Sequence, residues 1–188
     1  NPREYFYSSK RGNHIIEFAE NFCRHSKGKF GGQRVKLELW EKAHLATVFG
    51  FVDINGLRKY REVVLIVGKK NGKSLLGSIV GLYMLIGDGE AGPEVYAVAT
   101  KKDQAKIIWL ESKRMVNHSP SLLRRIKPLT AELSSEYYNC GTFKPVASDS
   151  DTLDGLNVHC VLMDEIHQWK NGKALYDIMA DGTAGREQ

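Results

Sequence analysis

The sequence has few cysteines and none of the residue spacings that bind structural metals. Three cysteines, Cys23, Cys140 and Cys160, lie far apart in 188 residues, and no C-x-x-C pair occurs. An odd and scattered set argues against a disulfide framework and a structural zinc site, and it fits a reducing compartment. The six histidines show neither H-x-x-H nor H-E-x-x-H spacing, so we expect no zinc site.

Long apolar runs and a large charge of one sign are also absent. No stretch of about 18 apolar residues occurs, which predicts no membrane span. The composition, 42% hydrophobic and 26% charged, is typical of one globular domain with a buried core. The formal net charge of +5 is compatible with a polyanionic partner, although a solvated basic surface accounts for it equally well.

Expected strands alternate with expected helices along the chain. Buried strands are predicted at residues 61–67, 94–100 and 158–163, where apolar and β-branched residues follow one another. Helices are predicted at residues 15–24, 39–49, 74–86, 103–116 and 175–179, with a loop-rich stretch at 117–136 and a short hairpin at 137–145. This alternation predicts a single α/β domain over residues 1–188, with a mostly parallel sheet and helices on both faces.

A glycine- and lysine-rich turn follows the first expected strand. Residues 68–74 read G-K-K-N-G-K-S, so the pattern G-x-x-x-x-G-K-[ST] is matched at its end, while Val67 stands where its first glycine belongs. Between a strand and a helix, such a loop points backbone N–H groups at an anion. A lysine-rich surface turn is the alternative that G-K-S alone leaves open.

Each residue type in this loop suits a triphosphate. Gly72 allows the backbone to approach the phosphates without a Cβ atom. Lys73 would reach the β- and γ-phosphates, and the Ser74 hydroxyl would be a Mg²⁺ ligand. Lys69 and Lys70 add positive charge where the triphosphate lies. The loop therefore predicts nucleotide binding.

Two acids end the third expected strand. Asp164 and Glu165 follow the apolar residues 158–163. Because unpaired acids are costly to bury, their place at a strand end predicts that they face a metal ion or water. Asp164 would hold Mg²⁺, and Glu165 would orient and deprotonate the attacking water. An ordinary acidic turn is the alternative, but ligands in such sheets bind beyond the carboxyl ends of strands, where both candidate sites fall.

Weaker features leave both interpretations open. Trp40 could stack on a base, although the helix at residues 39–49 is expected to turn it inward with Ala43, Leu45, Ala46 and Phe49. The acids of residues 148–155 are more simply explained as a solvated loop than as a metal site. A phosphate-backbone track and scattered solvated cations explain one basic set equally well, namely Lys101, Lys102, Lys106, Arg124, Arg125 and Lys127.

These motifs together resemble a family, the ATPase domain of tailed-phage terminase large subunits of the HK97-like type. Residues 37–41, L-E-L-W-E, look like its adenine motif, and residues 68–74 look like its deviant phosphate loop. Residues 148–156 resemble the stretch before its metal-binding strand, and residues 162–167 are similar to its D-E-x-H motif. Residues 183–185 resemble the motif that couples hydrolysis to DNA movement. The likeness covers nearly the whole chain.

The resemblance implies a RecA-like P-loop ATPase domain that uses ATP and Mg²⁺, with an N-terminal helical and adenine-motif segment at residues 1–50. Lys73 and Glu165 would be catalytic, and Ser74 and Asp164 would bind the metal. The ATP-binding set would be Trp40, Glu41, Gly68, Lys69, Lys70, Asn71, Gly72, Lys73 and Ser74, and the coupling residues would be Thr183, Ala184 and Gly185.

The resemblance also implies partners and a place of action. A terminase motor moves double-stranded DNA into a procapsid in the cytoplasm of a bacterial host. It works with a terminase small subunit and a portal protein, as a homo-oligomeric ring assembled on the portal and without a membrane. Family members carry a C-terminal nuclease domain, which we expect to be absent here because residues 1–188 are filled by the ATPase motifs.

Two positions depart from the family pattern. Glu41 stands where the family has Gln, and a carboxylate accepts a hydrogen bond from adenine but donates none. Lys69 stands where the family has Arg, and an ammonium group lacks the bidentate fork of a guanidinium. Two alternative functions follow from the motifs: another P-loop helicase or translocase, and a non-hydrolysing docking module with a vestigial phosphate loop.

Overall fold

A mixed five-stranded sheet forms the centre of the protein in a computed structural model, which describes residues 3–99, 102–137, 140–147, 156–169, 172–183 and 186. The strand order is β4-β5-β6-β3-β7. Strands β6, β3 and β7 run parallel, whereas β4 and β5 are antiparallel additions at one edge. The bounds of these strands are β3 Glu94–Ala99, β4 Lys127–Pro128, β5 Leu133–Ser135, β6 Gly141–Ala147 and β7 Val158–Met163.

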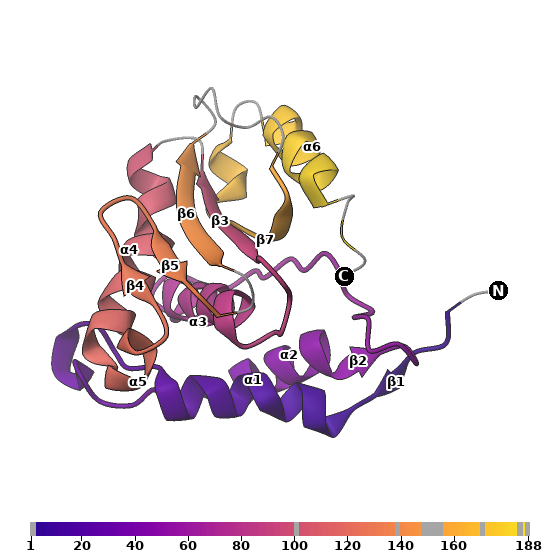
Figure 1. The fold of residues 1–188 in the computed structure, drawn as a ribbon, viewed down its shortest axis with the longest axis horizontal. Helices are drawn as coiled ribbons and strands as arrows, with labels where there is room; N and C mark the ends of the chain where they lie inside the picture. Colours follow the sequence, from indigo (N-terminus) through magenta and orange to yellow (C-terminus); the bar gives the residue numbers. More distant parts are fainter. Residues whose placement is uncertain are drawn as a thin grey trace.

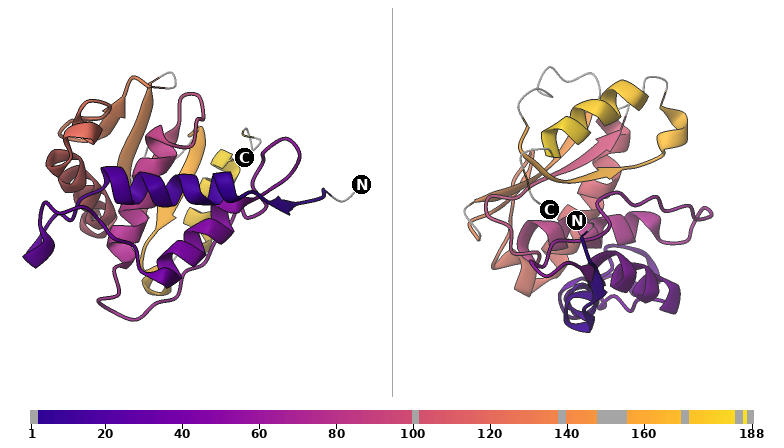
Figure 2. Two further views of the ribbon diagram at one scale, coloured as in Figure 1. Left: turned by 90° about the horizontal axis from the view of Figure 1, so that it is seen from below. Right: turned by 90° about the vertical axis from the view of Figure 1, so that its right-hand side faces the viewer.

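Helices cover both faces of the sheet, as the sequence predicts (Figures 1 and 2). Helices α3 and α4 pack on one face and α6 packs against β7 on the other. Helices α1 and α2 pack against each other and form an outer layer against α3. The bounds are α1 Ser9–Phe22, α2 Leu39–Gly50, α3 Lys73–Ile86, α4 Lys102–His118, α5 Pro120–Leu123 and α6 Gly172–Thr183, with short 3₁₀ turns η1 Gly28–Phe30 and η2 Ile166–Gln168.

Two apolar clusters hold the layers together. The larger one lies between the sheet, α3, α4 and the outer helices, and includes the fully buried Tyr83, Phe143 and Leu45. The smaller one lies under α6 and includes Trp169 and Met179. Because each face of the sheet is covered, β3 is buried along nearly its whole length, which explains why its sequence is continuously apolar.

The N-terminal part is helical, as the sequence predicts, but its details differ. Helix α1 begins at Ser9 because the Ser8 side chain accepts a hydrogen bond from the backbone N–H of Arg11, a helix cap that the apolar spacing did not reveal. Strands β1 Phe6–Tyr7 and β2 Phe51–Val52 pair antiparallel beside these helices.

The prediction of a buried strand at residues 61–67 is wrong. Among the described residues this segment joins no sheet, and Val64 and Ile66 are 77% and 90% exposed. Within the described part of the chain, no backbone hydrogen bond joins residues 62–67 to another element. A strand buried on both faces needs a neighbour on each edge, and β7, the outermost strand here, pairs only with β3.

Smaller differences concern residues 117–147. The loop-rich stretch contains α5 and two short strands, and the expected hairpin at 137–145 is instead β6, a strand that pairs with β3 and β5. Tertiary pairing decided this element, because its own sequence alternates too little to indicate a central strand. No described helix has the length and apolarity needed to cross a membrane.

Candidate active site

The loop at residues 68–74 opens helix α3, as the sequence predicts. Gly72 is the residue before the helix and has a left-handed backbone with φ 76°, which glycine adopts without strain. No side chain caps the first turn of α3, so its N–H groups remain available to an anion. Lys70 is also left-handed, with φ 69°, and the Asn71 side-chain amide donates to the Gly68 carbonyl at 3.2 Å.

The two halves of the expected site meet. The Lys73 ammonium group lies 3.1 Å from Asp164 Oδ1 and also makes an ion pair with Glu165 Oε1. Lys73 begins α3, and the two acids follow β7, so the elements bring together groups about 90 residues apart in the sequence. The predicted convergence of residue 73 with residues 164 and 165 is therefore confirmed.

Charge pairing dominates the protonation of this cluster. The hydrogen bond from Lys73 holds the pKa of Glu165 below its ordinary value, despite an opposing contribution from burial. Burial alone would lower the pKa of Lys73, but its hydrogen bonds to Glu165 and Asp164 outweigh burial and raise it. Both shifts favour the charged forms, which are the forms that bind phosphate and activate water.

Neighbouring residues orient the carboxylates. Glu165 has a left-handed backbone with φ 52°, and its N–H donates to Asp164 Oδ1 at 2.9 Å. Glu165 Oε2 accepts from the Gln168 amide at 3.4 Å and lies 3.3 Å from His167 Nε2. The Trp169 indole N–H donates to the Asp164 carbonyl at 3.1 Å. Sequence reasoning found His167 only as part of D-E-x-H, and it missed Gln168 and Trp169, which no motif indicates.

The adenine-motif residues lie differently from the prediction. Trp40 and Ala43 are exposed rather than inward, and Glu41 is 6% exposed and forms the inward row of α2 with Leu45 and Phe49. Spacings of four residues place these three side chains on one helix face, one step away from the predicted one. The expected inward packing of Trp40 and Ala43 is therefore wrong.

Glu41 also has a structural role beside the phosphate loop. Its Oε2 accepts from the Glu38 backbone N–H at 2.8 Å, and the Glu38 side chain returns a bond to the first turn, so the pair forms a capping box. A Cβ atom placed on Gly72 would lie 3.5 Å from Glu41 Oε1. Glu41 thus borders the loop that opens α3.

The coupling segment is described only in part. Thr183 is the last residue of α6, and its hydroxyl donates to the Ala180 carbonyl at 2.7 Å. Ala184 and Gly185 lie outside the described residues, as do Lys101 and residues 148–155. Arg186 follows, with a side chain 7% exposed that bonds Glu90 at 2.7 Å and the Gly92 carbonyl at 2.8 Å. Sequence reasoning gave no role to Arg186.

Residues suited to Mg²⁺ are present at this place. Ser74 follows Lys73 directly, and the Asp164 carboxylate lies against the Lys73 ammonium group. Mg²⁺ prefers few protein oxygens, with waters and phosphate oxygens filling its octahedron, so one hydroxyl and one carboxylate fit this ion. The described residues contain no cluster of three His, Cys, Asp or Glu side chains, which is the ligand set of a self-sufficient metal site rather than of this kind.

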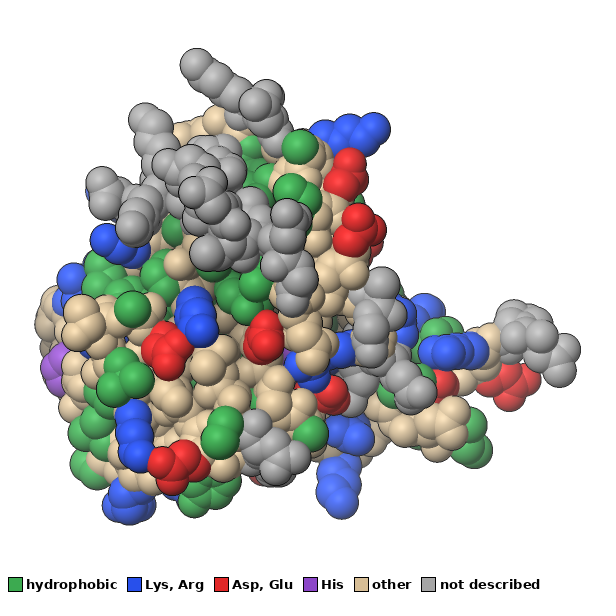
Figure 3. All heavy atoms as spheres, turned by 45° about the horizontal axis from the view of Figure 1, so that its top comes forward, with side chains coloured by type: hydrophobic (Ala, Val, Ile, Leu, Met, Phe, Trp, Pro, Cys, Tyr) green, Lys and Arg blue, Asp and Glu red, His purple; other side chains and the backbone are tan. Residues whose placement is uncertain are grey.

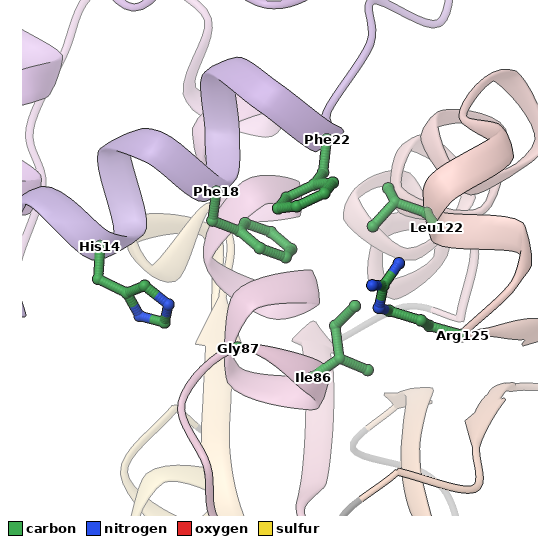
Figure 4. Close-up of a pocket in the computed structure, with 7 residues that line it drawn as sticks. All are labelled: His14, Phe18, Phe22, Ile86, Gly87, Leu122 and Arg125. Atoms are coloured by element: carbon green, nitrogen blue, oxygen red, sulfur yellow. The ribbon is translucent and has the colours of Figure 1, made fainter.

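A separate pocket lies far from these groups along α3. It is lined by Phe18 and Phe22 of α1, Ile86 at the last residue of α3, and Arg125 after α5 (Figure 4). Arg125 lies 5.8 Å from the Phe22 ring centre. Since α3 begins at Lys73 and ends at Ile86, this pocket belongs to the opposite edge of the sheet from the carboxylates.

Comparison with known proteins identifies the family. A family model described as "Terminase large subunit, ATPase domain" matches residues 39–187. The chain belongs to this family. The large subunit of the terminase of Enterobacteria phage HK97 is 27% identical over 161 residues, which cover 84% of this chain and 31% of that protein.

The fold agrees with that of a solved relative. The crystal structure of the HK97 bacteriophage large terminase matches with a TM-score of 0.77 and 23% identity, over 94% of this chain and 36% of that one. This likeness confirms the α/β terminase ATPase fold, with a sheet that is mostly but not wholly parallel. The chain spans about a third of the length of these relatives.

Proposed function

We propose that this terminase ATPase domain binds Mg-ATP between residues 68–74 and the end of β7, and hydrolyses it. The observation that carries the proposal is the triple contact of Lys73 with Asp164 and Glu165, which places a phosphate-binding ammonium group beside a metal-binding and a water-activating carboxylate. Phosphate oxygens compete with the two carboxylates for Lys73, so nucleotide binding exchanges one set of ion pairs for another.

Each group has a distinct role in this proposal. Lys73 stabilises charge on the transferred phosphoryl group, and Glu165 orients and deprotonates the attacking water. Ser74 and Asp164 hold Mg²⁺, which when bound neutralises phosphate charge and fixes the position of the β- and γ-oxygens. Gln168 and His167, both in contact with Glu165 Oε2, orient the general base.

The remaining expected site residues are part of the same proposal. The loop residues Gly68, Lys69, Lys70, Asn71 and Gly72 surround the triphosphate, and Trp40 and Glu41 approach the base. Glu41 Oε1 remains able to accept from adenine, because the capping bond uses Oε2. Thr183, Ala184 and Gly185 couple hydrolysis to movement of DNA.

The family indicates the cellular task. We propose that hydrolysis drives double-stranded DNA into a procapsid, in the cytoplasm of a bacterial host. The domain would act as part of a ring of identical chains on a portal protein, together with a terminase small subunit. The family match over residues 39–187 supports this task over that of another P-loop helicase.

Replacing Glu165 by Gln tests the chemistry. The amide cannot accept the proton of the attacking water, so phosphate release by E165Q should fall by about 100-fold or more, while ATP binding persists. Steady-state phosphate release and binding of a fluorescent ATP analogue measure the two effects. The matched control is E136Q, which neutralises an exposed carboxylate outside the site and should hydrolyse ATP normally.

Two results would refute the proposal. Normal turnover by E165Q would remove Glu165 from the mechanism. Absence of Mg-ATP hydrolysis in the assembled full-length protein would favour the docking module with a vestigial loop. Stimulation by single-stranded rather than duplex DNA would favour a helicase.

A further inference from the structure

The net positive charge of the chain comes from two short segments. Residues 24–36 and 112–131 contain ten of the 27 Lys and Arg residues and no Asp or Glu. The remainder of the chain holds the other 17 basic residues and all 22 acidic ones, so it is net negative. The ten cations are Arg24, Lys27, Lys29, Arg34, Lys36, Lys113, Arg114, Arg124, Arg125 and Lys127.

These two segments lie side by side in the fold. Residues 24–36 connect α1 to α2, and residues 112–131 contain the end of α4, α5 and β4. The Ser26 hydroxyl donates to Glu111 of α4, and Lys27 Nζ lies 4.0 Å from the same carboxylate. Both ribbon views place η1 beside α5 and the end of α4 (Figures 1 and 2). We call this combined surface the basic pole.

The first of the two segments holds its cations on a hydrogen-bonded backbone. The backbone N–H of His25 donates to the Gln33 carbonyl at 2.9 Å, and that of Val35 donates to the Cys23 carbonyl at 3.0 Å. The Arg24 guanidinium closes the turn through the Gly32 carbonyl at 2.8 Å. A connection ordered in this way presents its charges with little further loss of conformational entropy on binding.

Nearby acids neutralise little of the pole. Glu111 is buried and already receives Ser26, Lys27 and Arg114. Glu136 pairs with Lys127. Among the described residues no salt bridge holds Lys29, Arg34 or Arg124, all of which are exposed. On the face drawn in Figure 3, by contrast, acidic and basic side chains are largely interspersed.

We infer that the basic pole is the surface on which this domain holds the phosphate backbone of duplex DNA; the inference rests on the proposed motor function. Duplex DNA carries one negative charge for about every 1.7 Å of its axis, so it matches a cluster of exposed cations from two adjoining elements. A protein partner is a poorer match, because protein interfaces are depleted in Lys and have an apolar centre.

The topology separates the basic pole from the ATP site. Helix α4 leaves the carboxyl edge of the sheet after β3 and ends at His118, near the opposite edge. The pole lies at that end of α4, whereas Lys73 and Asp164 lie at the carboxyl edge. Changes at the pole should therefore weaken DNA binding without changing basal hydrolysis.

A charge-reversal pair with a matched control tests the inference. K29E/R34E changes two exposed cations of the pole, and K10E/K173E changes two exposed cations outside it, so both variants have the same net charge. Binding of a mixed-sequence DNA duplex is measured by fluorescence anisotropy at several salt concentrations, with ATP hydrolysis measured separately. We expect K29E/R34E to weaken binding about tenfold or more and to reduce the slope of log K against log salt by about 2, because each lost phosphate contact contributes roughly 0.9.

A milder pair, K29Q/R34Q, should give a smaller effect in the same direction and guards against misfolding of the reversed variant. The inference fails if both charge-reversal variants weaken binding equally, if the parent chain does not bind the duplex, or if K29E/R34E loses affinity for polyglutamate but not for DNA. The last result would indicate an acidic protein partner. Loss of hydrolysis in the parent chain would instead refute the proposed function and leave this surface unaffected.

Discussion

The Lys73 ammonium group pairs with two carboxylates, so the charge of each member depends on the others. Glu165 is kept ionised mainly by the hydrogen bond from Lys73, with smaller contributions from His167 and Lys69. A group with a depressed pKa contributes stability above its ordinary pKa, and that contribution is lost as pH falls through the lower value of the folded state. The pair with Lys73 should therefore be intact throughout the neutral range.

Removing the Lys73 charge should raise the pKa of Glu165. In K73M the dominant favourable interaction of the carboxylate is gone, so its pKa should move up toward the ordinary value of 4.5. A carbon-detected NMR titration of the Glu165 carboxyl measures the change. K70M is the control, because Lys70 makes no contact with Glu165; an equal shift in both variants would show that the effect is not specific to Lys73.

Residue-level prediction succeeded where a motif states the chemistry and failed where only position does. Lys73, Asp164 and Glu165 were predicted to converge, and they do. Arg186 and Gln168 carry no motif, and their contacts depend on where distant elements fold. For Ser74, Thr183 and the loop residues the predicted roles remain predictions that the experiments above address.

Helix α3 connects the two edges of the sheet and packs closely against it. A Cβ atom on Gly81 would lie 2.7 Å from Phe143 of β6 and 3.0 Å from Leu162 of β7. Only a glycine at this point lets the helix approach both strands. The position of Lys73 relative to Asp164 depends on this approach, since α3 and β7 carry the two halves of the site.

The G81A substitution should destabilise the protein by about 1–3 kcal/mol, because the added methyl group overpacks the helix–sheet interface. G77A, four residues earlier in α3, is the control. Its Cβ atom would lie 3.2 Å from the flexible tip of Ile108, and the gain in helix propensity offsets a small shift. Urea unfolding followed by circular dichroism compares the two, and equal losses would contradict the argument.

The same helix is also fastened at its other end. Asp88, just after α3, receives the Arg58 guanidinium at 2.6 Å and lies 3.0 Å from His159 Nε2 of β7, all three being largely buried. A register shift in β7 beside His159 frees this side chain from the regular alternation of the strand. Burial raises the pKa of Asp88, but His159 and Arg58 outweigh it and hold that pKa at about 2.

D88N should lower the free energy of unfolding by about 3 kcal/mol near neutral pH, because the amide leaves the Arg58 charge buried without its partner. The difference from the parent should shrink as pH falls from about 4 through about 2, where Asp88 itself becomes protonated. Urea unfolding at several pH values measures it. E136Q, in an exposed pair, is the control and should change stability by less than about 0.5 kcal/mol.

Elements were predicted well wherever periodicity and pairing agree. Strand β7 has the predicted bounds, and α2, α3 and α4 begin and end within two residues of prediction. Residues 61–67 show the limit of this reasoning. An apolar run indicates side chains that favour burial, but pairing requires a neighbouring strand in register, which a single segment cannot specify.

At the scale of the whole molecule, the fold separates chemistry from the net positive charge. Helix α3 and strand β7 hold the ATP site at the carboxyl edge of the sheet and the Arg58–Asp88–His159 network at the other. The basic pole lies at that second edge too, beside the ends of α4 and α1. DNA and ATP would therefore be held at different ends of the same two rigid elements.

Turnover per chain should be slow in dilute solution and rise with self-association. Phosphoryl transfer in ring motors gains from an arginine supplied by a neighbouring subunit, and here Lys69 stands at the family's arginine position. Measured over increasing protein concentration, specific hydrolysis should rise on the order of tenfold or more as oligomers form, which light scattering follows in parallel. Fast turnover by a monomer would contradict this expectation.

The sequence by itself determined the fold class, the phosphate loop and the strand-end acids, because hydrophobic periodicity and short motifs are local properties of the chain. Only the tertiary structure decided which residues meet: the inward turn of Glu41, the buried Asp88 network, the adjoining basic segments and the exposure of residues 61–67. These depend on contacts between residues far apart in the sequence, and packing and strand pairing fix such contacts collectively.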